Sequence, residues 1–146
     1  MISEMKGTQG DYIKSAANML TICANYLYVN SIIQDNPNLL VYQINEYINN
    51  HIGDEISVDL LCKAFFISKT KLYKLSLKNY NMGISDYIRH QRIKFAKKLL
   101  RNTEDSVASI GLRVGIKDAN YFIRIFKQIE GITPLQYRKS IMKDKD

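Results

Sequence analysis

One stretch of the chain is repeated about 50 positions later, and this repeat limits the possible folds more than any other feature. Two neighbouring positions match at an offset of 49 and three at an offset of 50: Leu61-Cys62 with Ile110-Gly111, and Ser68, Leu72 and Lys74 with Asp118, Phe122 and Arg124. Each copy reads as a short capped helix, a tight turn and a second helix with a basic exposed face. The chain is therefore expected to contain two related helix-turn-helix units.

The rest of the chain has helical periodicity as well, and strand signals are scarce. Seven helices are predicted after Pro37: Leu40–Ile52, Val58–Phe65, Ser68 to about Tyr80, Ser85–Arg101, Val107–Val114, Ala119–Ile129 and Pro134–Ile141. Four residues are expected to cap helices, namely Ser57, Ser68, Ser106 and Asp118, and three glycines to end them, namely Gly53, Gly115 and Gly131. The predicted class is all-α, with the long helix Ser85–Arg101 joining the two units.

Apolar spacing also predicts which side chains are buried. The long joining helix is expected to bury Tyr87, Ile88, Phe95, Ala96, Leu99 and Leu100. The second helix of each pair points Leu72 and Leu75, or Phe122 and Phe126, inward. Cys62 and Gly111 lie where the two helices of a pair must approach closely, so that a large side chain would push them apart.

The amino-terminal region has a different character. An extra amphipathic helix is predicted at Asp11–Gln34, with Asp11 as its cap, and its apolar stripe is too wide to be left in water. Asp35–Asn38 contains Pro37, which disfavours helix in the preceding residue, and is the expected linker. The expected division is 1–38 for this helix and linker and 39–146 for the helix-turn-helix domain.

Charge separates the same two regions. The net charge is +7, made up of −1 over residues 1–38 (two Lys, three acids) and +8 over 39–146 (19 Lys+Arg, 11 Asp+Glu). A basic second region indicates a polyanionic partner, with nucleic acid and anionic membrane as the alternatives. No apolar run reaches the about 20 residues of a membrane span, and no secretory signal is evident, so a cytoplasmic protein is expected.

Other site chemistry finds little support in the sequence. Cys23 and Cys62 are the only cysteines, and each lies in an apolar helical pattern, so buried thiols are expected, with a disulfide or metal pair as the alternative. The two histidines have no partners at ligand spacing, so no metal is expected. No phosphate-binding glycine loop, nucleophile set or carboxylate pair is evident. Neither an enzyme nor a cofactor is predicted.

The second unit carries a long, regularly spaced motif. Ile110–Lys127 reads IGLRVGIKDANYFIRIFK, followed by Gly131-Ile132-Thr133-Pro134 and Tyr137-Arg138. This pattern closely resembles the AraC/XylS transcription regulators over about Leu40–Lys139. The first unit departs from the family at three positions, Phe66 and Asn81 in place of frequent glycines and Ser76 in place of Phe. It is therefore expected to turn differently or to pack less tightly, with Leu75 and Leu77 supplying apolar contacts.

The resemblance implies that the second helix of each unit enters the major groove of double-stranded DNA. The groove-facing residues would be Lys69, Thr70, Tyr73 and Lys74 in the first unit and Asn120, Ile123 and Arg124 in the second. Arg124 suits guanine, Asn120 adenine, and Ile123 and Thr70 a thymine methyl group. Phosphate contacts are expected from Lys71, Lys78, Lys117 and Lys127. One monomer would read two successive segments of DNA, and a spacing below one turn would require DNA bending or a unit that contacts only backbone.

Several alternatives stay open at this stage. A helical protein-interaction module explains the helices but not two basic recognition helices. RNA polymerase is a further partner expected of a transcription regulator. The amino-terminal helix belongs either to a sensing or dimerisation domain of a longer chain or to a short regulator, and a homodimer through Ile13, Leu20 and Leu27 is a third possibility.

Overall fold

The computed structural model describes residues 9–143, apart from the side chains at positions 30, 33–35 and 143. Eight helices and no strand occur in this range: α1 Gln9–Asp35, α2 Pro37–Asn50, α3 Val58–Phe65, α4 Lys69–Tyr80, α5 Ile84–Asn102, α6 Val107–Arg113, α7 Ala119–Glu130 and α8 Pro134–Lys143. The all-α prediction with two helix-turn-helix units, α3–α4 and α6–α7, is confirmed. The ends of the predicted regions, 1–8 and 144–146, lie outside the described residues.

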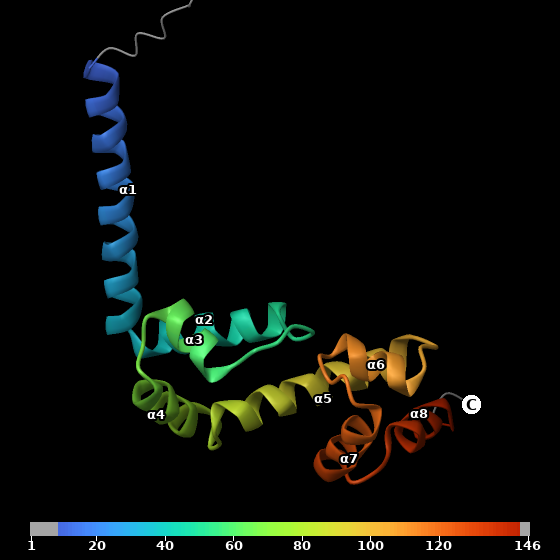
Figure 1. Ribbon diagram of the computed structural model, residues 1–146. Coiled ribbons are helices and arrows are strands. Elements are labelled where there is room, and N and C mark those ends of the chain that lie inside the picture. Colours follow the sequence, from blue (N-terminus) through green and yellow to red (C-terminus); the bar gives the residue numbers. More distant parts are fainter. Residues whose placement is uncertain (1–8, 144–146) are drawn as a thin grey trace, which may run out of the picture. The chain divides into compact units, whose positions relative to one another are not determined.

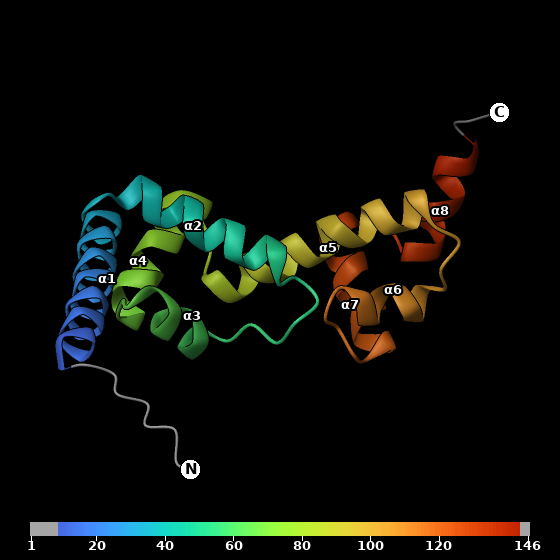
Figure 2. The same ribbon diagram turned by 90° about the horizontal axis from the view of Figure 1, so that it is seen from above.

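The chain separates into two compact parts, residues 1–40 and 41–146. In the second part, α5 runs between two groups of helices, as both views show (Figures 1 and 2). We call residues 41–80, which include α3 and α4, the first half, and residues 107–143, which include α6, α7 and α8, the second half. The predicted role of α5 as the joining element is confirmed.

Four helices of the second part start where their capping residues predict. Four side-chain oxygens each accept a hydrogen bond from the backbone amide three residues later. They belong to Ser57, Ser68, Ser106 and Asp118, at 3.0, 3.1, 3.1 and 2.8 Å. Each bond satisfies an amide that has no partner inside its helix. The starts of α3, α4, α6 and α7 are therefore set locally by one polar side chain each.

The helix breaks within the predicted segment Asp35–Asn38, but the break is shorter than predicted. α1 ends at Asp35 and α2 begins at Pro37, so Asn36 alone separates the two helices. The Asn36 side-chain oxygen accepts the amides of Asn38 and Leu39, at 3.1 and 3.2 Å. Proline suits the first position of a helix, where its missing N–H costs nothing, so Pro37 starts α2 directly after the break.

The beginning of α1 also differs from its prediction. Gln9 and Gly10 are already helical, so Asp11 lies inside α1 and is not its cap. A carboxylate there still favours the helix, since it lies near the positive end of the helix dipole.

The second half has an aromatic core. Phe122 and Phe126 are fully buried, with ring centroids 5.9 Å apart, and Phe126 meets Tyr137 of α8 at 5.8 Å. Around them pack buried aliphatic residues of α5, α6, α7 and the turn between α6 and α7: Ile93, Ala96, Leu99, Leu100, Ile110, Val114, Ile116 and Ile125. Phe95, predicted inward, is 38% exposed, because the buried side of α5 runs through Ile93 and Ala96 instead.

The first half packs on the beginning of α5 with a smaller, mostly aliphatic set of buried side chains: Ile44, Ile48, Ile52, Leu61, Ile67, Leu72, Ile84 and Ile88. Ser76 is buried although it is polar, and its hydroxyl donates a hydrogen bond to the Met82 carbonyl at 2.6 Å. The prediction for Leu77 is wrong, since this side chain is 39% exposed, while Leu75 is half-buried. The hydroxyl at position 76 is thus satisfied by backbone.

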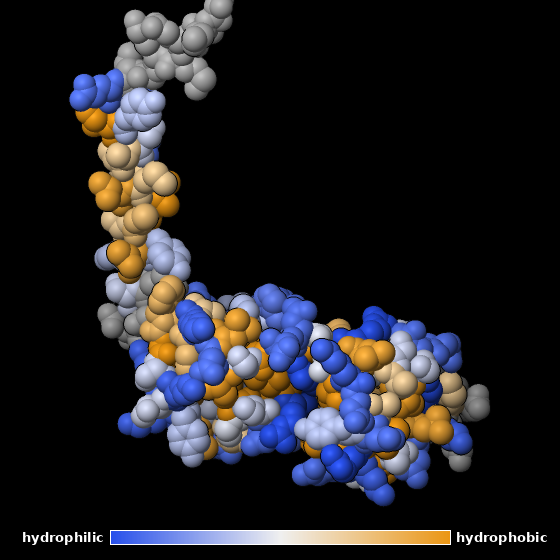
Figure 3. Space-filling model, viewed as in Figure 1, coloured by the Kyte–Doolittle hydropathy of each residue, from blue (hydrophilic) through white to orange (hydrophobic). Residues whose placement is uncertain are grey.

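α1 exposes its apolar side chains. Tyr26, Leu27 and Tyr28 are all more than half exposed. Because consecutive residues point in different directions around a helix, no single side of α1 is covered here. Tyr12, Ile13, Met19, Leu20 and Ile22 are exposed as well. The apolar surface of α1, visible in Figure 3, therefore extends beyond one stripe.

Candidate nucleic-acid interface

The two turns have the same backbone hydrogen bond. In the first unit the Ile67 amide donates to the Cys62 carbonyl at 3.1 Å, and in the second the Ile116 amide donates to the Gly111 carbonyl at 2.8 Å. These pairs are separated by the repeat offset of 49. Bonds of this kind end a helix through a residue in the left-handed region.

Different residue types occupy that left-handed position. Gly115 has φ +81°, which glycine adopts without a Cβ penalty, as predicted. Phe66 has φ 51° at the matching place. The expectation that the first unit turns differently is therefore wrong, because Phe66 takes the same conformation, at a steric cost that glycine avoids.

The predicted recognition residues lie on the solvent side of their helices. On α4, Lys69, Thr70, Tyr73 and Lys74 are all exposed, while Leu72 is buried. The helix thus presents two lysines, a hydroxyl and an aromatic ring on one accessible side. Such a side can enter a groove without disturbing the core beneath it.

α7 follows the same division between core and surface. Asn120, Ile123 and Arg124 are exposed, while Phe122 and Phe126 are buried. The Arg124 guanidinium lies over the Tyr121 ring, 5.4 Å from its centroid. This cation–π contact restricts the arginine while leaving its donors accessible.

The predicted phosphate-contacting lysines are not equally placed. Lys78, Lys117 and Lys127 are exposed, whereas Lys71 is half-buried. The ammonium groups of the three exposed lysines are accessible to solvent, so a phosphate could approach them.

An acidic residue near the first recognition helix was missed by the sequence analysis. Asp59 of α3 pairs with Lys69 of α4, with 2.7 Å between Oδ1 and Nζ. The hydrogen bond and charge of Lys69 hold the pKa of Asp59 below its ordinary 3.8, and Asp59 raises the pKa of Lys69. Both side chains are exposed, so water screens the pair and Lys69 can exchange its partner.

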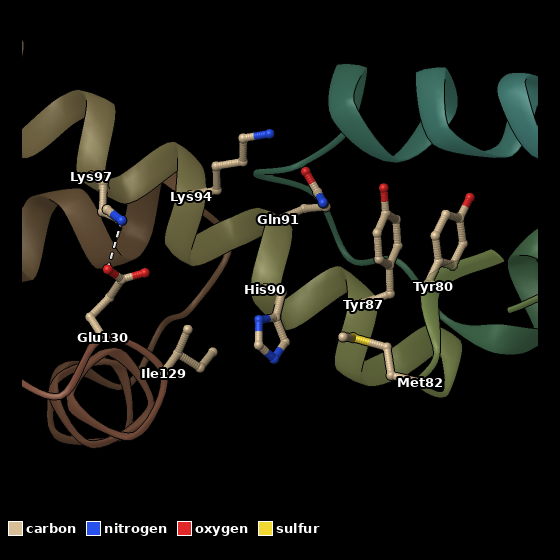
Figure 4. A pocket seen from close by; sticks show the side chains of 9 residues that line it. All are labelled: Tyr80, Met82, Tyr87, His90, Gln91, Lys94, Lys97, Ile129 and Glu130. Carbon is tan, nitrogen blue, oxygen red and sulfur yellow. Dashed lines mark ion pairs between the residues drawn. The ribbon is translucent and has the colours of Figure 1, made fainter. Parts of the chain in front are cut away.

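A groove of about 460 Å³ lies where the ends of α4 and α7 flank α5. Figure 4 shows Tyr80 and Tyr87 with their rings parallel, 3.7 Å apart, and Lys97 reaching Glu130. The Tyr87 hydroxyl donates to the Asn45 side-chain oxygen at 2.6 Å. The ring stack and this bond fasten the end of α4 and residue 45 to α5.

Burial changes the acidity of this tyrosine pair. The Tyr80 hydroxyl is buried and has no hydrogen-bond partner among the described residues, and burial raises its pKa to about 12. Burial also raises the pKa of Tyr87. Both rings therefore stay neutral at physiological pH and act through packing.

Residues 9–143 contain neither a candidate membrane span nor a candidate metal site. No helix in this range has the length and apolar character needed to cross a membrane. Within the same range, no three His, Cys, Asp or Glu side chains gather as a metal-binding group would require. Cys23 is exposed and Cys62 half-buried, both as free thiols, so the prediction that Cys23 is buried is wrong.

Comparison with known proteins agrees with this geometry. A family model described as a helix-turn-helix domain matches residues 61–140. The Msm operon regulatory protein of Streptococcus mutans is 33% identical over 104 residues, covering 71% of this chain and 37% of that protein. The transcriptional activator RhaR of Mannheimia succiniciproducens is 32% identical over 96 residues, covering 66% and 35%. The chain thus spans little more than a third of the length of these relatives.

Solved structures give the same result. The C-terminal domain of the response regulator yesN from Fusobacterium nucleatum superposes with a TM-score of 0.62 at 34% identity, covering 66% of this chain and 95% of that one. An AraC-type regulator from Chromobacterium violaceum shares the fold with a TM-score of 0.66 at 23% identity, covering 69% and 90%. The repeated turn, the capped helix pairs and the motif agree with these comparisons, and the chain belongs to the AraC-type helix-turn-helix transcription regulators.

Proposed function

We propose that residues 41–146 bind double-stranded DNA in a sequence-specific manner and that the protein regulates transcription through this binding. In this proposal α4 and α7 enter successive segments of the major groove. Their exposed residues contact base edges, and the lysines at the helix ends contact phosphates.

The observation that carries the proposal is the repeated geometry of the two units. Each has a buried row on one side of its second helix and an exposed row of polar and basic side chains on the other. A protein-interaction module does not require a basic outer row on the second helix of both pairs. The charge of +8 over residues 39–146 supports a polyanionic partner for this part.

The roles proposed for single residues follow from their donors. Arg124 offers the planar pair of N–H groups that recognises guanine, and Asn120 offers the donor and acceptor that recognise adenine. Lys74 on α4 is the repeat counterpart of Arg124. α5 has 19 residues, a length of about 28 Å, which with the flanking turns approaches one turn of DNA.

The test is selection of bound sequences from random duplexes, with the wild type, Arg124→Ala and Lys74→Ala. We expect each variant to lose preference at its own position, about ten base pairs apart, with about 1–3 kcal/mol of discrimination lost at a well-read base. Lys98→Ala is the matched control, since Lys98 is an exposed lysine on α5 outside the recognition helices. It should weaken binding to all sequences slightly and leave the motif unchanged.

Salt dependence separates this proposal from its rivals. Affinity for duplex should fall linearly on a log–log plot as salt rises, with a slope proportional to the phosphates contacted. A duplex affinity that ignores salt, or none at low salt, contradicts DNA binding. An unchanged motif in Lys74→Ala contradicts base reading by α4 and leaves the first unit with a positioning role.

The exposed surface of α1 supports a second part of the proposal, that two copies associate through this helix. Ile13, Leu20 and Leu27 recur at seven-residue intervals, and Cys23 lies at the heptad position paired with them. Mild oxidation should then link two chains through Cys23, while Leu20→Lys should abolish both this link and the dimer in sedimentation. A strict monomer at high concentration contradicts it. RNA polymerase is the further partner that we expect of such a regulator.

A further inference from the structure

Arg92 lies in the middle of α5, and its guanidinium group binds the backbone of both halves. Nε donates to the Ile52 carbonyl at 3.2 Å and Nη2 to the Asp54 carbonyl at 2.7 Å. Nη1 donates to the Gly115 carbonyl at 3.2 Å. Ile52 and Asp54 belong to the loop between α2 and α3, and Gly115 forms the turn of the second unit. One side chain therefore joins two segments more than 60 residues apart.

Two glycines let the same segments approach at backbone distance. A Cβ atom at Gly53 would lie 2.8 Å from the Arg113 carbonyl oxygen. A Cβ atom at Gly115 would lie 2.9 Å from the Ile52 carbonyl oxygen and 2.9 Å from Nη2 of Arg92. These distances are shorter than a carbon atom tolerates, so neither position has room for a side chain. The two halves thus meet through their backbones as well as through α5.

The position of this contact gives it consequences for α7. Gly115 lies three residues before Asp118, the capping residue of α7, so the turn that Arg92 holds leads directly into the second recognition helix. The planar guanidinium, with donors pointing in several directions, is suited to binding three carbonyls at once, whereas the ammonium of a lysine is a compact point charge. A lysine at position 92 would keep the charge but not the three-way contact.

We propose that Arg92, with Gly53 and Gly115, forms a clamp that sets the angle between the two helix-turn-helix units and thereby the number of base pairs between the two DNA segments that they read. The part concerning DNA rests on the proposed function; the part concerning the angle does not. Arg92 is a positioning residue in this proposal, since it acts on the recognition helices through the backbone it holds.

The angle is tested first without DNA. Spin labels at Asn79→Cys on α4 and Gln128→Cys on α7, both exposed positions, report the distance between the recognition helices in the full chain carrying Cys23→Ser and Cys62→Ala. We expect a narrow distance distribution with Arg92 and a clearly broader one with Arg92→Lys. Gly53→Ala should broaden it too, because it opens the same joint while keeping the arginine.

The spacing is tested with the duplex selected above and with duplexes that gain or lose one base pair between the two segments. One added base pair rotates and shifts one segment relative to the other, so the wild type should lose about tenfold or more in affinity. Arg92→Lys and Gly53→Ala should lose only about threefold or less on the same change. Binding to a duplex with the α7 segment alone should stay within about twofold of wild type.

Arg89→Lys is the matched control, since Arg89 lies one turn away on α5 and pairs with Asp86 outside the joint. It should keep the wild-type distances and the wild-type spacing penalty. Wild-type distances and an unchanged spacing penalty in both Arg92→Lys and Gly53→Ala would overturn the clamp. If the wild type shows no salt-dependent duplex binding, the proposed function fails, and the spin-label distances still decide whether the clamp exists.

Discussion

The two helix-turn-helix units have the same backbone turn and different interiors. The amide-to-carbonyl bond that closes each turn recurs at an offset of 49. Phe66 and Gly115, the left-handed residues of the two turns, lie at equivalent positions. Inside, the second unit buries Phe126 where the first buries Ser76. Backbone geometry and its capping bonds are thus preserved while the packing beneath them changes.

This difference shows which interactions each unit depends on. In the second unit, aromatic rings of α7 and α8 pack on one another, so apolar contact holds the recognition helix in place. In the first, a buried hydroxyl bound to the Met82 carbonyl and the Tyr80–Tyr87 stack take over part of that role. Substitutions at equivalent positions should therefore have unequal effects.

The largest difference is expected at the repeat pair Phe126 and Ser76. Phe126→Ala removes a fully buried ring and should lower the free energy of unfolding by about 3–5 kcal/mol. Ser76→Ala leaves the Met82 carbonyl without its partner and should cost about 1 kcal/mol. Urea unfolding followed by circular dichroism measures both. Equal losses would mean that the two interiors carry similar energy despite their composition.

Opposite signs are expected at the two left-handed turn positions. Gly115→Ala adds a Cβ at φ +81° and against Ile52 and Arg92, and should lower the free energy of unfolding by about 1–2 kcal/mol or more. Phe66→Gly removes the penalty at φ 51° and should raise it by about 0.5–1 kcal/mol. Thermal unfolding of the two variants, compared with the wild type, measures both changes. A loss in Phe66→Gly would show that the ring contributes more than its conformation costs.

The smallest effect concerns charge near the first recognition helix. Asp59 has Ala108 as its counterpart in the second unit, so Asp59→Asn makes the two units more alike. Removing the carboxylate frees Lys69 and should raise affinity for duplex about two- to threefold at low salt, with the gain disappearing at high salt. Asp86→Asn is the control, because Asp86 pairs with Arg89 on α5. An equal gain in both variants would point to net charge alone.

Features with a local cause were predictable. Ser57, Ser68, Ser106 and Asp118 cap the helices that they were expected to cap, since the capping bond spans only three residues. The burial of Leu72, Phe122 and Phe126 follows from helical spacing in the same way. Local rules also placed the helix break near Pro37 but made it too long, because proline is favourable at the first position of the next helix.

Features with a distant cause were not predictable. The exposure of Phe95 and Leu77 depends on which side of each helix meets a neighbour, and the apolar pattern alone allowed more than one choice. The pair of Asp59 with Lys69 joins two helices across a turn. In the sequence, Arg92 is one more basic residue on a long helix. In the structure, its N–H groups donate to carbonyls of both halves.

The repeated helix pairs and their arrangement in space therefore have different causes. The sequence alone determined that two capped helix pairs form and that each presents a basic outer row, because caps, periodicity and turns act over a few residues. Only the tertiary structure decided how the two pairs are held relative to each other. That arrangement rests on the hydrogen bonds of Arg92 to the loop at Ile52 and Asp54 and to Gly115, and on the close approach of Gly53 to Arg113. These residues are distant in the chain, so their contacts exist only in the folded protein.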